Sequence, residues 1–295
     1  MSITRTRIGW IGTGKMGAPM ARQLVAAGAD VTVCDPIAAN AQSVGAQVAG
    51  SNREAAGDAE ITVSMIPNDA VLRDVALGEG GILSVMQPGS VYVDMSTVAP
   101  ETSLEVAAAA EAVEIGYIRA PVSGSTILAE AGNLTIMVSG PREAAKRCDP
   151  LFSVLGATHF YVGESEQARY LKLVLNLLVG TSGAVLGEAL TLGRKGGLDW
   201  DQMLDVIGES VAASPYIKYN LAPLKARDFS PMFSAEQMLK DSRLISEAGA
   251  NAGVPMAFGD AMRALFEDTV AAGHGEENLT VALKLLEERS GLEES

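Results

Sequence analysis

The first half of the chain alternates between two hydrophobic patterns. Short runs rich in valine and isoleucine are separated by alanine-rich segments that favour helix. The runs are RIGWIG (7–12), DVTVCD (30–35), EITVSMIP (60–67), SVYVDMS (90–96), EIGYIRAP (114–121), NLTIMVSG (133–140) and, as an edge strand, THFYVG (158–163). Strands that alternate with helices pair in parallel, because each helix crosses back to the start of the next strand. The pattern therefore predicts an open α/β sheet.

The strand pattern stops at Gly163, and helical periodicity replaces it. One long helical pattern runs from Glu164 to Leu192. Further helices, punctuated by glycine or proline, are predicted at 199–210, 235–253, 255–273 and 279–289. A chain of 295 residues is long enough for two separate cores. We therefore predict an α/β domain over residues 1–163 and an all-helical domain over residues 164–295.

Net charge and hydropathy exclude some classes of binding partner and indicate where in the cell the protein is expected. The formal net charge of −14 argues against nucleic acid or an anionic membrane surface as a partner. The most apolar stretch of spanning length, residues 170–190, is interrupted by Lys172, Asn176 and Glu188. No charged, apolar and small-residue leader precedes the first strand. We expect a soluble, cytoplasmic protein that is not inserted in a membrane.

A glycine-rich turn follows the first predicted strand and opens the first helix. The turn contains Gly12, Thr13, Gly14, Lys15, Met16 and Gly17. Asp35 ends the next strand run. Glycines let backbone amides approach a pyrophosphate at a helix N-terminus, and the acid accepts hydrogen bonds from ribose hydroxyls. This context predicts a dinucleotide site, in which Lys15 either adds charge near the phosphates or faces solvent.

The stretch YLKLVLNLLVG (170–180) places two polar side chains on an apolar helix. Lys172 and Asn176 are four residues apart and therefore share one helix face. An unpaired, desolvated ammonium costs several kcal/mol, so this face needs a polar partner. Glycines at 180, 183 and 187 continue the same face and are expected to leave room beside the pair. A snorkelling lysine and a capping asparagine are the structural alternatives.

Histidine and cysteine do not offer an obvious catalytic centre. The two histidines, His159 and His274, lie in an edge strand and in a late turn. No cluster of histidine, cysteine or carboxylate has metal-ligand spacing, and no Ser-His-Asp arrangement is visible. A lysine is therefore the natural proton carrier, and no metal is expected.

Seven short motifs are spread along nearly the whole chain: GTGKMGAPM (12–20), MIPN (65–68), DMSTVAP (94–100), APVSGS (120–125), GNLTIMVSG (132–140), KLVLN (172–176) and MLKD (238–241). In this order they resemble the β-hydroxyacid dehydrogenases related to 3-hydroxyisobutyrate dehydrogenase. The resemblance implies a Rossmann-type N-terminal domain, a long interdomain helix, an all-α C-terminal domain and an active site in the cleft between them. It also implies hydride transfer between a nicotinamide cofactor and a small 3-hydroxy acid or its semialdehyde.

The resemblance assigns roles to individual residues. Lys172 corresponds to the acid/base lysine and Asn176 to its amide partner, while Ser123 and Gly124 correspond to the loop that holds the substrate carboxylate. The matching cofactor contacts are Thr97, the backbone at Ile66 and Pro67, and Lys240 near the nicotinamide. Apolar neighbours and nearby cations are expected to lower the pKa of Lys172.

Cofactor preference follows from the end of the second strand. The Asp35 carboxylate repels a 2′-phosphate, and no arginine follows it to neutralise that charge. We therefore expect NAD to be preferred over NADP.

One position departs from the family pattern. Arg119 stands where the family usually has aspartate. Its guanidinium either faces solvent or adds a second cation to the cleft, which would favour a longer or more acidic substrate.

Other functions on the same fold are less consistent with the residues. A phosphogluconate dehydrogenase would need a histidine where this chain has Leu175, and a longer helical domain. Imine or keto reduction is disfavoured because imine reductases commonly replace the lysine that is present here at 172. A non-catalytic dinucleotide-binding module would have no use for Ser123, Lys172 and Asn176. The apolar helical domain suggests a homodimer or a homotetramer.

Overall fold

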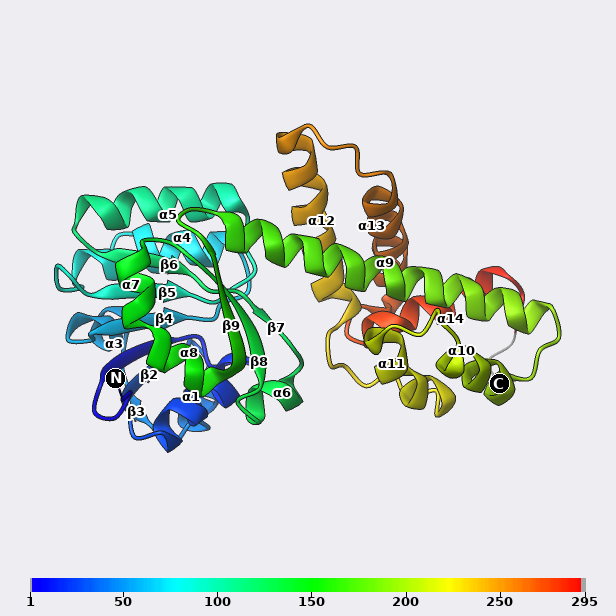
Figure 1. The fold of residues 1–295 in the computed structure, drawn as a ribbon, viewed down its shortest axis with the longest axis horizontal. Helices are drawn as coiled ribbons and strands as arrows, with labels where there is room; N and C mark the ends of the chain where they lie inside the picture. Colours follow the sequence, from blue (N-terminus) through cyan, green and yellow to red (C-terminus); the bar gives the residue numbers. More distant parts are fainter. Residues whose placement is uncertain (1, 293–295) are drawn as a thin grey trace. The chain divides into compact units, whose positions relative to one another are not determined.

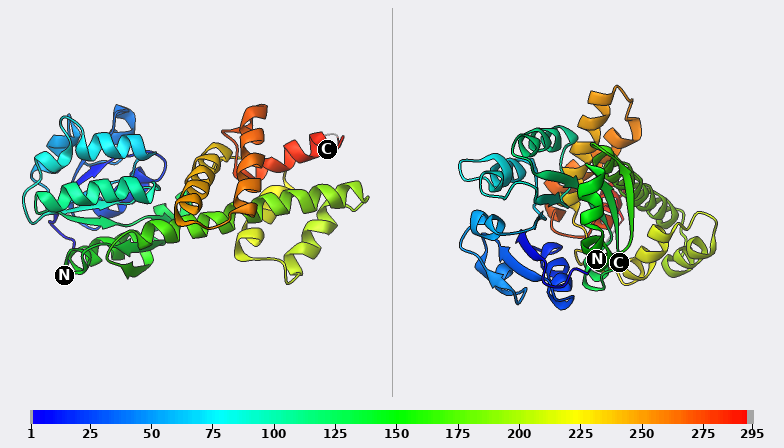
Figure 2. Two further views of the ribbon diagram at one scale, coloured as in Figure 1. Left: turned by 90° about the horizontal axis from the view of Figure 1, so that it is seen from above. Right: turned by 60° about the vertical axis from the view of Figure 1, so that its left-hand side comes forward.

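The computed structural model describes residues 2–292. The chain divides into two compact units, Met1–Lys172 and Leu173–Ser295. The helix Gln167–Lys195 is continuous through the point of division (Figures 1 and 2).

The first unit is built on one nine-stranded sheet. Its strands are β1 (Arg7–Ile11), β2 (Asp30–Cys34), β3 (Gln47–Val48), β4 (Ile61–Ser64), β5 (Val91–Asp94), β6 (Gly116–Arg119), β7 (Val122–Ser123), β8 (Leu134–Ser139) and β9 (Gly156–Gly163). Their order is β3-β2-β1-β4-β5-β6-β8-β7, and β9 pairs with β8. This is the doubly wound arrangement in which β1 lies between the two halves of the sheet. All seven predicted strands are present.

The prediction of parallel pairing holds for only part of the sheet. Strands β1 to β6 pair in parallel, but β8 is antiparallel to both β6 and β7. The connection from β7 to β8, residues 124–133, is shorter than the dozen or so residues that a parallel crossover needs, so β8 returns antiparallel. The strands β3 and β7 were not predicted, because a two-residue strand is too short to show an alternating pattern.

Helices pack on both faces of this sheet. They are α1 (Gly17–Ala26), α2 (Ala38–Gln42), α3 (Asn52–Gly57), α4 (Asp69–Leu77), α5 (Pro100–Ala112), α6 (Thr126–Glu130), α7 (Arg142–Arg147) and α8 (Asp149–Leu155). Successive strand residues point to opposite faces. Val91 and Val93 of β5 therefore join the core beneath α1 and α8, whereas Tyr92 joins the core beneath α4 and α5.

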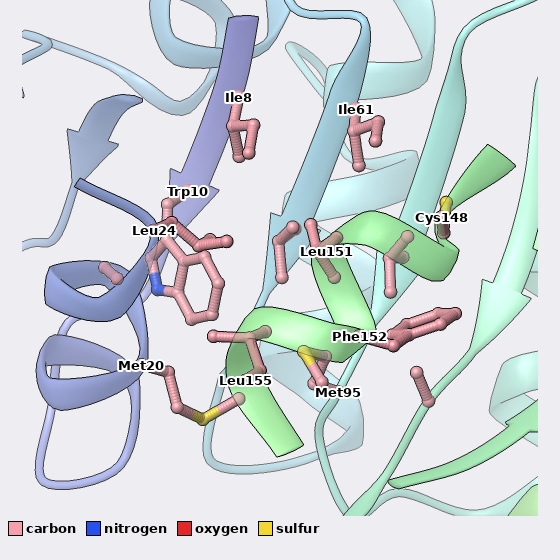
Figure 3. Close-up of a cluster of buried hydrophobic side chains, with 14 of the residues drawn as sticks. Ile8, Trp10, Met20, Leu24, Ile61, Met95, Cys148, Leu151, Phe152 and Leu155 are labelled. Carbon is pink, nitrogen blue, oxygen red and sulfur yellow. The ribbon is translucent and has the colours of Figure 1, made fainter. Parts of the chain in front are cut away.

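The core beneath α1 and α8 also supports the glycine-rich turn. Figure 3 shows Trp10 of β1 among side chains of both helices, including Leu24 and Leu151. Trp10 is fully buried, and its indole nitrogen donates a hydrogen bond to the carbonyl oxygen of Gly12 at 2.9 Å. The packed core thus fixes the start of the turn.

The regular elements of the second unit, within its described residues, are helices. It contains the greater part of α9 (Gln167–Lys195), then α10 (Trp200–Glu209), α11 (Pro215–Lys225), α12 (Ala235–Ala252), α13 (Ala257–Thr269) and α14 (Ala282–Arg289). The helices predicted from the sequence are present within a few residues. The helix α11 was missed because proline, both at its start and at Pro223 inside it, signals a break. Ser234 and Gln237 form a capping box that begins α12.

The helix α9 is long and apolar enough to cross a membrane by length and composition alone. Its most apolar window has a mean hydropathy of 1.6, and 39% of that window is buried. A single helix of this kind is weak evidence, because core helices of soluble proteins have the same composition. No other described helix of residues 2–292 meets these criteria.

Candidate active site

At two of the three glycines in the turn, the surrounding backbone leaves no space for a side chain. Gly12 has φ +88°, and a Cβ there would lie 2.3 Å from the Met65 carbonyl oxygen. A Cβ on Gly17 would lie 2.0 Å from the carbonyl oxygen of Gly12. A Cβ on Gly14, in contrast, would meet no atom within 4 Å. Gly12 and Gly17 therefore allow strand and helix to pack closely, and Gly14 leaves open space for a ligand.

The N-terminus of α1 suits an anion. The helix has no acidic residue in its first turn and no side-chain hydrogen bond at its N-cap. The N–H of Ala18 donates to the Gly14 carbonyl oxygen at 3.0 Å and Pro19 has no N–H, so a phosphate would be met by the N–H groups of the preceding turn, where the helix dipole also favours an anion. Lys15 is exposed beside this turn, and Met16 packs partly against the core. The Thr13 hydroxyl is buried without a hydrogen-bond partner, as expected of a group that awaits a ligand.

Asp35 holds the same turn from the end of β2. Its Oδ2 accepts a hydrogen bond from the backbone N–H of Thr13 at 2.7 Å, and its Oδ1 accepts one from Ile37 at 2.9 Å. The carboxylate therefore orders the turn, a role that the sequence did not reveal. Open space at Gly14, the uncapped helix and this acid together fit a dinucleotide.

The other predicted cofactor contacts lie at the ends of neighbouring parallel strands. Ile66 follows β4, and the Cβ position of Gly12 is 3.2 Å from its side chain. The backbone N–H of Ile66 donates to the Ser96 hydroxyl at 2.9 Å. Pro67 is exposed beside Ile66, and Thr97 follows Ser96 after β5. The structure thus brings the loops after β1, β4 and β5 together, as at the switch point of other doubly wound sheets.

The two glycines Gly14 and Gly17 make a matched test of the cofactor site. We expect Gly14→Ala to leave the melting temperature unchanged and to raise the KM for the cofactor about tenfold to a hundredfold, the equivalent of about 1–3 kcal/mol of steric overpacking. Gly17→Ala should instead lower the melting temperature, because its new Cβ clashes with the Gly12 carbonyl. Thermal melts and cofactor titrations measure both effects. An unchanged cofactor KM in Gly14→Ala would contradict the assignment.

Lys172 lies against the predicted substrate loop. It is half-buried on α9, and its Nζ donates a hydrogen bond to the Val122 carbonyl oxygen of β7 at 2.8 Å. Ser123 is the next residue, and Gly124 follows with φ +143°. A Cβ on Gly124 would lie 2.7 Å from the Leu134 side chain. The first unit therefore brings Lys172, Ser123 and Gly124 together.

Asn176 and Lys240 meet in the second unit through a carboxylate. Asn176 is buried, and its side-chain nitrogen donates to Asp241 Oδ2 at 2.5 Å. Lys240 Nζ lies 2.8 Å from Asp241 Oδ1. Asp241 was not predicted as a site residue, although it ends the motif MLKD. Its contacts make Asp241 the group that holds the Asn176 amide.

The glycines of α9 do not leave the room that the sequence suggested. A Cβ on Gly180 would lie 2.4 Å from the sulfur of Met262, and one on Gly183 would lie 2.5 Å from Leu279. At Gly187 the nearest atom, from Leu286, would be 3.2 Å away. That expectation was wrong, because neighbouring helices of the second unit occupy the space. The glycines permit close helix packing.

Arg119 does not face solvent. It is 3% exposed, pairs with the Glu166 carboxylate and lies 4.7 Å over the ring centre of Tyr117. The solvent-facing interpretation is therefore wrong. Burial of a guanidinium requires a partner, and Glu166 supplies it from the residue that precedes α9.

A second buried ion pair, which the sequence analysis missed, lies at the end of β5. Asp94 pairs with Arg169 of α9, and both side chains are almost fully buried. Asp94 Oδ1 also accepts hydrogen bonds from the hydroxyls of Ser64 and Ser96, each at 2.6 Å. The motif DMST and the arginine one turn before Lys172 were the available signals. Neither signal shows that the two residues meet.

Within residues 2–292, no group of three or more histidine, cysteine or acidic side chains is arranged to hold a metal ion.

Comparisons with known proteins agree with this geometry. A model described as the NAD binding domain of 6-phosphogluconate dehydrogenase matches residues 7–163, and one described as NAD-binding of NADP-dependent 3-hydroxyisobutyrate dehydrogenase matches residues 167–286. The 2-(hydroxymethyl)glutarate dehydrogenase of Eubacterium barkeri is 37% identical over 97% of this chain and 96% of its own. The chain belongs to the β-hydroxyacid dehydrogenase family related to 3-hydroxyisobutyrate dehydrogenase.

Solved structures share the fold over nearly the whole chain. Mycobacterium tuberculosis 3-hydroxyisobutyrate dehydrogenase with L-serine has a TM-score of 0.87 at 27% identity, covering 96% of this chain and 99% of that one. Psf3 in complex with NADP⁺ and 2-OPP has a TM-score of 0.85 at 28% identity, covering 95% of this chain and 99% of that one. The predicted fold, a Rossmann-type domain followed by a helical domain, is confirmed.

Proposed function

We propose that the protein is an NAD-preferring dehydrogenase of a small 3-hydroxy acid, or a reductase of the corresponding semialdehyde, with Lys172 as the acid/base. The observation that carries the proposal is the position of the Lys172 ammonium, 2.8 Å from the Val122 carbonyl oxygen and next to Ser123. This position supports the proposal, because it puts an ammonium beside the loop that is expected to hold a carboxylate.

The protein's own groups divide the chemistry between them. The Lys172 ammonium donates a proton to the substrate oxygen during reduction, and the neutral amine accepts that proton during oxidation. The Ser123 hydroxyl and the backbone of the following glycine hold the substrate carboxylate. Asn176 orients the reacting groups, with its own amide held by Asp241. The nicotinamide cofactor, when bound, supplies or takes the hydride.

The proposed substrate must carry a carboxylate that reaches Ser123 and a hydroxyl or carbonyl oxygen that reaches Lys172, and this requirement defines the substrate class. The similar Eubacterium barkeri protein is named for 2-(hydroxymethyl)glutarate, a dicarboxylate whose hydroxyl is on the carbon next to C2. A substrate with the carboxylate at that spacing would contact Ser123 while its oxygen reached Lys172. We therefore include dicarboxylates with the shorter 3-hydroxy acids.

A screen of substrates with both cofactors tests the proposal. Absorbance of the reduced nicotinamide is followed with glyoxylate, with succinic, methylmalonic and tartronic semialdehydes, and with 2-(hydroxymethyl)glutarate. Turnover should require a carboxylate, and the matching esters should be poor substrates. Equal rates with cyclic imines, or no turnover with any hydroxy acid, would contradict the proposed function.

Ser123 provides a test of the carboxylate loop. We expect Ser123→Ala to raise the KM for the carboxylate substrate, because a hydrogen bond to a charged group contributes roughly 1.5–3 kcal/mol, about 10- to 100-fold. The KM for NAD should not change. Ser125→Ala is the matched control, since Ser125 makes no side-chain hydrogen bond at the start of α6. An equal loss of NAD binding would place Ser123 on the cofactor side.

The exposed face of α9 supports a homo-oligomer, either a dimer or a tetramer. Leu178, Val185 and Leu192 recur every seven residues and are 60%, 61% and 74% exposed. Phe258 of α13 is 84% exposed and lines a cavity of about 330 Å³ with Leu178 and Val185. Apolar stripes at this spacing are typical of helix pairing between subunits.

A further inference from the structure

The first turn of α9 is attached to the sheet by a buried arginine that has no role of its own in the proposed reaction. Arg169 is 1% exposed, and its guanidinium reaches four groups of the first unit. These are the Asp94 carboxylate, the Ser96 carbonyl oxygen at 2.8 Å, the Tyr117 hydroxyl at 3.0 Å and the Ser103 hydroxyl at 3.2 Å. The fork of the guanidinium is therefore held in one orientation.

Stability alone does not explain this arrangement. A buried ion pair recovers little more than its own desolvation cost, and well-packed apolar side chains are often at least as stabilising. Burial opposes the charge of Arg169, but the neighbouring Tyr117, Asp94 and Glu166 raise its pKa above the ordinary value. The guanidinium remains charged, and what it adds over apolar packing is a fixed geometry.

The geometry that is fixed includes Lys172. Arg169 precedes Lys172 by three residues, so the two side chains are neighbours on one helix face. Asp94 is the last residue of β5, a central strand of the sheet. The carboxylate therefore connects a rigid strand end to the helical turn from which the Lys172 ammonium reaches the Val122 carbonyl oxygen.

We propose that the Asp94–Arg169 pair is a positioning device for Lys172, holding the first turn of α9 so that the ammonium stays beside Ser123. This inference rests on the proposed function of Lys172. A displacement of about 1 Å at a reacting group can lower turnover by about 100-fold, so a loosened turn should lower kcat strongly.

The matched control is the other buried ion pair at the same end of α9. Glu166 precedes the first helical residue, so its pair with Arg119 holds the entry of the chain and not the helical turn from Arg169 to Lys172. We expect Arg169→Met and Arg119→Met to lower the melting temperature to a similar extent. The kcat per folded molecule, measured well below the melting transition, should fall roughly 10- to 100-fold only in Arg169→Met.

A double-mutant cycle then separates positioning from a purely structural role. If Arg169 acts through Lys172, Arg169→Met should lower kcat no further in a Lys172→Ala background, while its effect on the melting temperature persists. The inference would be overturned if the kcat of the double variant fell by the product of the two single losses. It would also be overturned if Arg169→Met and Arg119→Met lowered kcat equally. Near-wild-type turnover in Lys172→Ala would instead refute the proposed function.

A conservative variant covers the case in which Arg169→Met does not fold. Arg169→Lys keeps a positive charge opposite Asp94 but cannot reach Ser96, Ser103 and Tyr117 together. It should fold, with a kcat between those of wild type and Lys172→Ala. Wild-type kcat in a folded Arg169→Lys variant would show that the fork geometry does not matter, and would also overturn the inference.

Discussion

Replacing Lys172 by alanine should lower turnover by a factor on the order of 10²–10⁴ while leaving the fold and NAD binding intact. The side chain is half-buried, and its Nζ donates a hydrogen bond to the backbone carbonyl oxygen of Val122. Lys172→Arg should not restore turnover, because a guanidinium does not release its proton. Steady-state kinetics with the best substrate of the screen measure the loss.

The same helix offers a matched control for this prediction. Lys195, in the last turn of α9, also donates a hydrogen bond to a backbone carbonyl oxygen, that of Ser290, at 2.8 Å. Lys195→Ala should retain wild-type turnover. If Lys172→Ala retained it as well, the lysine would be structural and the proton would come from water or another group.

The pH profile gives an independent readout of Lys172. Oxidation requires the neutral amine, so the wild-type oxidation rate should rise with pH as the amine loses its proton. Reduction requires the ammonium and should fall over the same range. Both dependences should be absent from the residual activity of Lys172→Ala.

Wild-type enzyme should prefer NAD over NADP by about 100-fold or more in kcat/KM, because a like-charge contact costs several kcal/mol. The Asp35 carboxylate occupies the end of β2, where a dinucleotide presents its ribose. The Asp35 carboxylate also acts on the thiol of Cys34, the residue before it. Burial, followed by Asp35 and Glu54, raises the pKa of Cys34 above its ordinary value.

The variant that tests cofactor choice must respect the second role of Asp35. Asp35→Asn keeps an oxygen that can accept the Thr13 N–H, and Pro36→Arg, at an exposed position, adds a cation for the 2′-phosphate. The double variant should narrow or reverse the NAD preference. Asp30→Asn, at the exposed start of β2, should leave the ratio unchanged. A wild-type enzyme that already works better with NADP would show the interpretation to be wrong.

Local pattern was sufficient for most of the secondary structure. Short apolar runs predicted every strand longer than two residues, because strands covered on both faces are apolar along their whole length. Helical periodicity predicted α9, α10, α12, α13 and α14, because a helix that packs on others buries one apolar face. The helix α11 was missed because its prolines signal a break, and the antiparallel pairing of β7 with β8 was missed because the direction of pairing depends on the connection and not on periodicity.

The candidate site was predictable as far as its residues lie in motifs. The turn at Gly12, the acid at Asp35 and the pair Lys172 and Asn176 are each visible in a short stretch. The physical reason for each glycine was not, because space around an atom is a property of neighbours distant in sequence. Gly14 faces open space, whereas Gly180 of α9 contacts Met262 across a helix interface.

Charge pairing was decided only by the tertiary structure. The sequence by itself determined that the chain carries a dinucleotide turn, a helical half and a lysine on an apolar helix. It did not determine that Arg119 meets Glu166, that Arg169 meets Asp94 or that Asn176 meets Asp241. A buried charge must find a partner, but any of many acids in the chain satisfies that requirement until folding brings one within a few ångströms. The identity of each partner, and the position of Lys172 beside Val122, therefore follow from packing.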